Sequence, residues 1–215
     1  MASEDRTAGG MAVVWDLGVR IGHWVLVAAF AVAYLTGGEA LEFHEWAGYV
    51  VAAYVVCRLI WGFIGSKYAL FGDFLYGPRR ALTYLRDMVR GRARRYLGHS
   101  PAGSFMVFAL LIMLAGTVTT GMAELAVTHG EGPFSTLLQA RSADRLSQAT
   151  SLRATGTSEE QESMLREVHE LFANLTLVMI ALHIVGVLVA SIAHRENLVV
   201  SMVTGRKQVD PERSD

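Results

Sequence analysis

The chain of 215 residues has few of the residues that cross-link or interrupt a soluble domain, and few charges. It contains one cysteine, Cys57, and four prolines, and 18% of its residues are charged against 52% that are hydrophobic. A single cysteine excludes an intramolecular disulfide, and we expect Cys57 to be a small packing residue. The net charge of −1 shows no excess of basic residues, and we expect no nucleic-acid partner.

Hydrophobic residues are gathered in four separate runs of about the length that crosses a bilayer core, roughly 20 residues. The sequence therefore predicts an all-α integral membrane protein, a bundle of four transmembrane helices. We expect a polar N-terminal tail over residues 1–14, with no cleaved signal peptide, a membrane domain over 15–194 and a tail over 195–215. The predicted spans are Val19–Thr36, Trp46–Ile64, Gly103–Met122 and Leu171–Ala193, with an outer loop over 123–166.

The charges between the spans predict the orientation. Eight basic residues and two acidic ones lie between Gly65 and Ser100, whereas the turn Gly37–Glu45 has no Lys or Arg. By the positive-inside rule the basic segment and both termini lie in the cytoplasm, so we expect a multi-pass protein in contact with membrane lipid.

The segment GPRRALTYLRDMVRG predicts a short helix that Pro78 opens and Gly91 closes. Its apolar stripe favours a position in the cytoplasmic interface, and a solvated basic face is the alternative. Ser100 and Pro101 predict the cap and first turn of the third span. The stripe consists of Ala81, Leu82, Leu85 and Met88/Val89.

Two histidines lie 14 residues apart in the fourth run, HELFANLTLVMIALHIVGVLVASIAH. Fourteen residues are close to four helical turns, so His169 and His183 lie on one side of the helix, about 21 Å apart along its axis. Ionisable residues inside a membrane are costly and indicate function.

Helix direction sorts four histidines into two pairs of matched depth. His44 and His169 lie toward the outer face, and His23 and His183 toward the cytoplasm. Ligands of one metal centre in a bundle must lie at one depth on facing helices, so this matching predicts two cofactor sites. Packed or interfacial histidines are the alternative. We expect His99 to be a loop or capping residue, His129 to be solvated and His194 to be interfacial.

The donor set favours haem over zinc. Two imidazoles per site leave the tetrahedral shell of zinc half empty but complete the octahedron of a haem iron. No C-x-x-C-H occurs, so the haem would be non-covalent. No H-E-x-x-H occurs either, so the zinc metalloprotease motif is not present. Glu45 and Glu170, each next to a candidate ligand, are expected to point about 100° away from it. Arg58, near the cytoplasmic pair, is a candidate to neutralise haem propionates, and snorkelling to the interface is its alternative.

The sequence also resembles the bacterial membrane cytochrome b561 family, relatives of the b-type subunit of nickel–iron hydrogenases. The resemblance implies a four-helix bundle with two haem b groups, and the family's ligand positions fall on His23, His44, His169 and His183. It covers nearly the whole chain except residues 1–11 and the outer loop. The segments that carry it are VWDLGVRIGHW, HEWAGYVV, CRLIWGFIGSKYALF, GPRRALTYLRDM, RRYLGHSPAGS, HELFANLTLVMIALH and HRENLVVSMVTGRK.

These observations predict a di-haem protein that passes electrons between a quinone pool and a redox partner. The partner is an outer c-type cytochrome, a dehydrogenase subunit or an oxygen species, and the direction of flow is open. Two alternatives belong to other classes: a haem-containing membrane anchor that recruits a redox subunit, and a His-lined metal or proton transporter. The third span offers little beyond Thr117, Thr119 and Thr120 to line a transport path.

Overall fold

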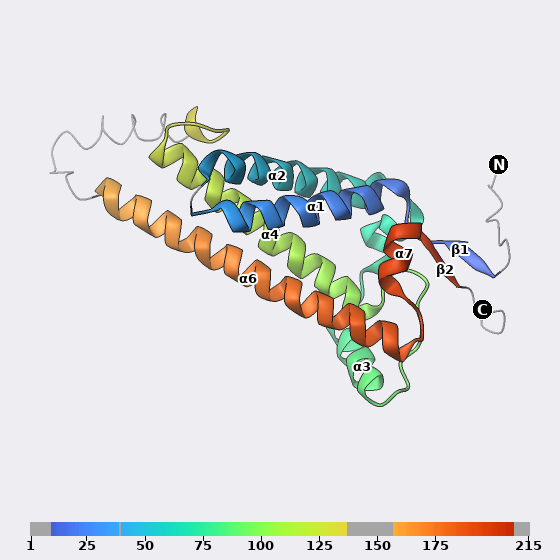
Figure 1. Ribbon diagram of the computed structural model, residues 1–215. Helices are drawn as coiled ribbons and strands as arrows, with labels where there is room; N and C mark the ends of the chain where they lie inside the picture. Colours follow the sequence, from blue (N-terminus) through green and yellow to red (C-terminus); the bar gives the residue numbers. More distant parts are fainter. Residues whose placement is uncertain (1–9, 39, 137–156, 209–215) are drawn as a thin grey trace.

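The computed structural model describes residues 10–38, 40–136 and 157–208, and its main body is a bundle of four long helices (Figure 1). Each helix is long and apolar enough to cross a membrane, α6 over Glu162–Ala193. The predicted integral membrane helical bundle is confirmed. The four helices are α1 (Leu17–Thr36), α2 (Leu41–Ile64), α4 (Pro101–Thr128) and α6 (Thr157–Ala193).

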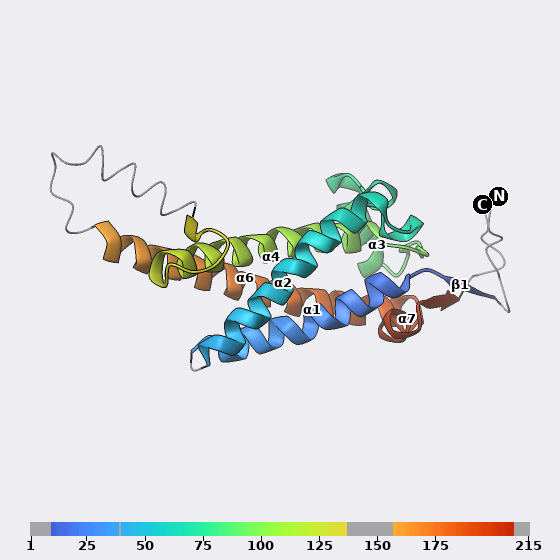
Figure 2. The ribbon, with the colours of Figure 1, turned by 90° about the horizontal axis from the view of Figure 1, so that it is seen from above.

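Six shorter elements lie at one end of the bundle, which also holds the basic segment 65–100 and is called the basic end here (Figures 1 and 2). The helices run antiparallel in sequence order, so the α1–α2 turn lies at the opposite end. The shorter elements are the strands β1 (Met11–Val13) and β2 (Arg206–Gln208), the 3₁₀ turns η1 (Lys67–Ala69) and η2 (Phe71–Phe74), and the helices α3 (Pro78–Val89) and α7 (Leu198–Thr204).

The helices extend beyond the predicted spans at the opposite end. α2 begins at Leu41 rather than Trp46, α4 continues to Thr128 and α6 begins at Thr157, so both ends of the predicted outer loop are helical. Polar residues continue a helix once its apolar part is fixed by packing, and hydropathy alone does not mark that extension. The two predicted tails also contain regular structure. β1 lies in the N-terminal tail, and α7 and β2 lie in the C-terminal tail.

The short helix α3 has the predicted limits. Pro78 is its first residue, and Gly91 follows it in the left-handed conformation, at φ 66°. The apolar residues divide between two sides: Ala81 and Tyr84 are buried, whereas the outward side remains uncovered. That outward side consists of Leu82, Leu85 and Val89.

The helices pack closely in two pairs, α1 with α2 and α4 with α6. Contacts between α2 and α4 join the two pairs. A buried cluster around Ala29, Val51, Val55 and Leu114 fills the middle of the bundle. Outside it most side chains of the spans are exposed, as expected where lipid covers them. Cys57 is exposed on α2, so the expectation that it packs inside was wrong.

The two ends of the described chain meet at the basic end. β1 pairs antiparallel with β2, with Ala12 opposite Lys207, and this pair is called the terminal ribbon here. The Arg20 guanidinium of α1 donates to the carbonyl of Val203 in α7. Arg95, from the segment before α4, forms an ion pair with Glu196 at 2.9 Å and donates to the Gln208 carbonyl at 2.7 Å. The last residues therefore tie α1, α6 and the α3–α4 segment together.

Asp16 fastens the start of α1 to the end of α2. One carboxylate oxygen accepts from the Val19 amide at 2.8 Å as the N-cap, and the other accepts from Trp61 Nε1 at 3.2 Å and from the Ser66 hydroxyl. Partial burial acts to raise the pKa of this carboxyl, but the hydrogen bonds outweigh it, so the pKa of Asp16 lies below its ordinary value. A lowered carboxyl pKa means that the ionised form stabilises the fold.

We predict that Asp16→Ala destabilises the purified protein by about 0.5–2 kcal/mol at neutral pH, the usual cost of losing an N-cap. The stabilisation is complete above the ordinary carboxyl pKa and is lost as the pH falls through the lowered pKa. Thermal unfolding in detergent should therefore separate Asp16→Ala from the wild type at pH 7 and bring them together in acid. Asp73→Ala, which removes an exposed carboxylate, should not show this behaviour.

Candidate cofactor sites in the bundle

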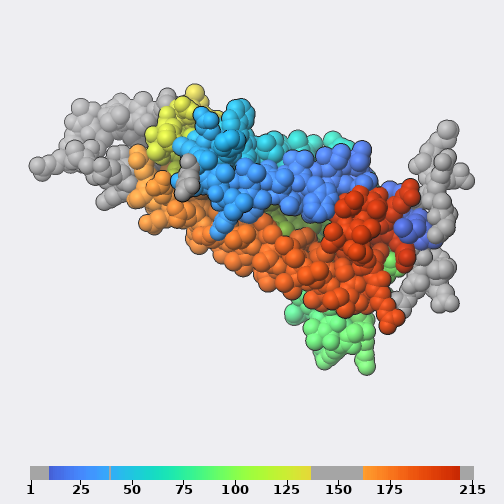
Figure 3. Space-filling view, viewed as in Figure 1, coloured from blue at the N-terminus to red at the C-terminus, as the bar shows by residue number. Residues whose placement is uncertain are grey.

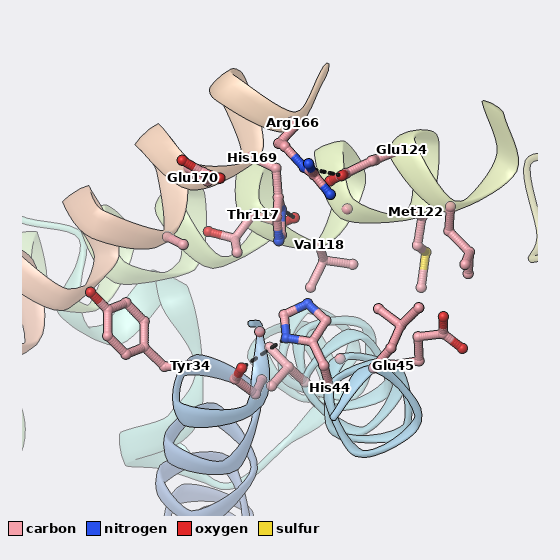
Figure 4. Close-up of a pocket in the computed structure, with 18 of the residues that line it drawn as sticks. Tyr34, His44, Glu45, Thr117, Val118, Met122, Glu124, Arg166, His169 and Glu170 are labelled. Atoms are coloured by element: carbon pink, nitrogen blue, oxygen red, sulfur yellow. Dashed lines mark hydrogen bonds and ion pairs between the residues drawn. The ribbon is translucent and has the colours of Figure 1, made fainter. Parts of the chain in front are cut away.

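His44 and His169 face one another at the end of the bundle opposite the basic end (Figure 4). Their ring centres lie 6.0 Å apart and their planes are perpendicular. Two metal–imidazole bonds of about 2 Å each, with the distance from each bonding nitrogen to its ring centre, add up to about 6 Å. The ring separation therefore fits two imidazoles that share one metal ion.

The inner nitrogens of both rings are held by main-chain carbonyls. His44 Nδ1 lies 2.8 Å from the Ala33 carbonyl oxygen, and His169 Nδ1 lies 3.0 Å from that of Thr117. A carbonyl only accepts, so each Nδ1 must carry the proton. Each Nε2 is then left with its lone pair free, which is the arrangement that orients histidine ligands in metal sites.

The same local pattern produces both hydrogen bonds. In each case the accepting carbonyl belongs to the residue four positions before a glycine, Gly37 for Ala33 and Gly121 for Thr117. A Cβ on Gly121 would lie 2.8 Å from His169 Cε1, and one on Gly37 would lie 3.4 Å from His44 Nδ1. The missing side chains let each imidazole reach a carbonyl of the neighbouring helix.

A cavity of about 470 Å³ surrounds this pair and is within the range of ligand pockets. Its wall is mostly apolar near the rings, and an ion pair between Arg166 and Glu124, 3.4 Å long, lies above His169 (Figure 4). Gly48, one turn after His44, lines the cavity with nothing within 4 Å of its Cβ position. These features fit a large flat cofactor between the two imidazoles.

Glu45 and Glu170 also line this cavity. A residue adjacent in sequence turns about 100° on the helix, but a cavity shared by three or four helices is wider than one helical face. Their side chains lie around the two imidazoles without being placed between them (Figure 4).

His23 and His183 lie nearer the basic end, on α1 and α6. Both are half-buried. His23 Nδ1 is buried with no hydrogen-bond partner, and the Cβ position of Gly186, one turn after His183, has nothing within 4 Å. Atoms of α4 are visible between the surfaces of α1 and α6 (Figure 3). A half-buried imidazole with an unpartnered nitrogen is suited to a cofactor ligand at this level as well.

The Cβ position of Gly22, unlike that of Gly186, is not in open space. The Tyr54 ring lies 3.0 Å from its Cβ position, so Gly22 serves packing between α1 and α2. Among the described residues no group of three or more His, Cys, Asp or Glu side chains is placed to hold a metal ion. The sites therefore offer two imidazoles each, which suits a haem iron better than zinc.

Arg58 is buried rather than extended to the surface, with 7% of it exposed, so the snorkelling alternative is wrong. Its guanidinium lies over the Phe71 ring, 4.9 Å from the centre, and donates to the Ala69 carbonyl at 3.2 Å. The loop after α2 folds back over the end of the helix and covers the side chain, which helix periodicity does not predict.

The other histidines have separate surroundings. His99 is enclosed by the Trp15 and Phe74 rings, at 4.8 and 4.2 Å between centres, and burial with the nearby charges of Arg58 and Lys207 lowers its pKa to about 3. It lies in the loop before α4, as predicted, with its side chain neutral and enclosed, and the capping role falls to Ser100. His194 accepts from or donates to the Tyr84 hydroxyl at 3.1 Å, and His129 is exposed.

Comparison with known proteins identifies the class of molecule. Residues 14–205 match the family described as prokaryotic cytochrome b561, and the chain belongs to that family. It is therefore a membrane b-type cytochrome that transfers electrons with haem b.

Similar proteins carry the name probable Ni/Fe-hydrogenase B-type cytochrome subunit. That of Azotobacter chroococcum mcd 1 is 23% identical, over 94% of this chain and 90% of the relative. That of Rhodobacter capsulatus is 22% identical, over 93% of this chain and 82% of the relative. That of Rhizobium leguminosarum bv. viciae is 25% identical, over 90% of this chain and 87% of the relative. No solved structure matches the chain significantly.

The glycine pattern makes a graded prediction. Gly121→Ala should displace His169 and lower the haem content of the purified protein, although alanine favours a helix by up to about 1 kcal/mol over glycine. Gly37→Ala should have a smaller effect, because 3.4 Å is an ordinary contact. Gly38→Ala, with nothing within 4 Å, is the matched control. Equal haem content in all three variants would contradict the prediction that the imidazole needs a glycine at the point where it contacts the neighbouring helix.

Proposed function

We propose that this cytochrome holds two haem b groups, one between His44 and His169 and one between His23 and His183, and passes electrons between quinone and a redox partner. The pair of His44 and His169 carries the proposal. Two ring centres 6.0 Å apart, with both Nδ1 atoms bound to carbonyls, direct two free lone pairs toward one central atom. The half-buried pair at the other level supports a second site.

When bound, a haem iron with two imidazole ligands supplies reversible one-electron redox chemistry and leaves no position open for oxygen. The chain's own contribution is to hold neutral imidazoles at fixed orientation. The carbonyls of Ala33 and Thr117 fix the tautomer and the rotation of the outer pair. The apolar cluster around Val51 and Leu114 lies between the two levels and excludes water there.

The proposed orientation puts the basic end in the cytoplasm and the His44–His169 pair at the outer face. Eight basic residues in the segment 65–100 support it. The proposed redox partner is a membrane-associated enzyme subunit or an outer c-type cytochrome. The names of the similar hydrogenase subunits favour the enzyme subunit, and quinone is the proposed small-molecule partner on the membrane side.

We predict two haems for each chain, in six-coordinate, low-spin form. The pyridine haemochrome assay with quantitative amino-acid analysis gives the ratio, and optical and electron paramagnetic resonance spectra give the coordination. A ratio close to one, or a mainly high-spin spectrum, would contradict two bis-histidine sites.

The pairing makes a separate prediction. His44→Ala and His169→Ala should remove one haem and leave the same residual spectrum and potential, and His23→Ala and His183→Ala should leave the other. His129→Ala, which removes an exposed histidine near the outer cavity, should retain both haems. If the variants at positions 23 and 44 lost the same haem, the proposed pairing would be wrong.

A further inference from the structure

Buried nitrogen atoms without a partner are concentrated at the basic end. In the part of the chain that the structure describes, four such side-chain nitrogens occur, and none belongs to the outer pair of histidines. Unpaired buried polar groups are rare in proteins and cost about 1–3 kcal/mol each, with a higher cost for charged groups. The four atoms are Arg20 Nε, His23 Nδ1, a terminal nitrogen of Arg58 and His99 Nδ1.

Two of these groups are guanidiniums, and they lie at similar depth. The contacts between α1 and α2 fix the register: the Trp61 ring lies 3.9 Å from the Cβ position of Gly18, and the Tyr54 ring lies 3.0 Å from that of Gly22. Arg58 lies between Tyr54 and Trp61 on α2, and Arg20 lies between Gly18 and Gly22 on α1. Both are about one helical turn from His23, toward the basic end.

Neither guanidinium forms an ion pair with a described carboxylate. Arg20 and Arg58 each donate to a main-chain carbonyl, of Val203 and Ala69 respectively. Two acidic groups at the basic end are already occupied: both oxygens of Asp16 accept hydrogen bonds from other residues, and Glu196 pairs with Arg95. The buried guanidinium of Arg58 and the part-buried guanidinium of Arg20 therefore lack a carboxylate counter-ion among the described residues.

We propose that Arg20 and Arg58 together bind the two carboxylates of the haem held by His23 and His183. This inference rests on the proposed function, and it deepens it by naming the groups that orient that haem. A haem b has two propionate carboxylates, so two guanidiniums balance its charge. Guanidinium forks suit carboxylates, and such charge-assisted hydrogen bonds are strong where water is excluded.

Arg20 also connects the haem to the end of the chain. Its guanidinium donates to Val203, and it lies 3.1 Å from the Cβ position of Gly205, which has φ 79° and precedes β2. A carboxylate on the unpaired Nε of Arg20 would therefore fix the side chain that holds α7 against α1. Arg58 is fixed in a different way, because its guanidinium lies over the Phe71 ring.

The first experiment compares haem content and potentials in Arg20→Gln, Arg58→Gln, Arg58→Lys and the control Arg79→Gln, which removes an exposed arginine of α3. We expect the two glutamine variants to lose part of one haem. In the remaining fraction that haem should have a lowered midpoint potential, because a positive charge near the iron is gone, while the other haem is unchanged. Arg58→Lys should keep the potential but not the full haem content, because lysine retains the charge and loses the fork.

The second experiment identifies the anion. Apoprotein from haem-deficient cells is titrated in detergent with haem and with haem dimethyl ester, whose carboxylates are blocked. The glutamine variants should bind haem at that site about tenfold or more weakly than the wild type, and should bind the ester as the wild type does. If the arginines bind a phospholipid phosphate instead, the variants should bind haem and its dimethyl ester with equally weakened affinity. That result would overturn the assignment.

The outcomes separate this inference from the proposed function. If His23→Ala removes a haem but Arg20→Gln and Arg58→Gln leave the content and potential of that haem unchanged, the carboxylate site is wrong and the ligand pairing stands. If His23→Ala and His183→Ala leave both haems in place, the proposed function itself fails. Helix content by circular dichroism identifies a variant that does not fold, and the other arginine variant then decides the question.

Discussion

The arrangement of the outer site depends on one requirement, that a buried imidazole must pair its second nitrogen. Inside an apolar bundle the available acceptors are helix carbonyls, which are already used by their own helix. A carbonyl has two lone pairs, and a glycine four residues later leaves the second one accessible. Thr117 with Gly121, and Ala33 with Gly37, satisfy this requirement for His169 and His44. The position of α6 against α4 and of α2 against α1 follows from it.

The middle of the bundle is packed differently from the two histidine levels. Ala29, Val51, Val55 and Leu114 form a closed apolar layer, and the fully buried Thr176 lies 3.1 Å from the Thr117 hydroxyl. The levels on either side contain a cavity, open glycine faces or unpaired nitrogens. The bundle therefore gets its own stability from a central layer, and the two histidine levels are less closely packed.

Much of this was predictable because membrane helices have strong, simple signals. The four spans, the limits of α3 and the Ser100 cap follow from hydropathy, proline and capping residues. The approach of His44 to His169 agrees with the depth estimate, which used only helix rise and direction. The four ligand assignments and Arg58 as a propionate partner stay predictions.

The failures have a common physical cause, which is that tertiary contacts of short segments have no periodic signal. The burial of Arg58 and of His99 results from the loop after α2 folding over the helix ends. The carbonyl acceptors of Ala33 and Thr117 are main-chain atoms and have no residue type to recognise. The glycines at 37 and 121 were the available signal, since each lies four positions beyond an acceptor.

The terminal ribbon has a consequence for the order of biosynthesis. β2 (Arg206–Gln208) follows all four long helices, whereas its partner strand β1 (Met11–Val13) precedes them, so the fastening at the basic end needs both sides of the bundle. The ribosome has already released α1, α2 and α4 to the membrane before residues 206–208 leave the exit tunnel. The level of His23 and His183 thus stays unfastened until residues 206–208 have left the ribosome, whereas the carbonyl contacts of His44 and His169 involve no residue beyond position 169. The contacts at the outer level can consequently form first, and β2 closes the inner level later.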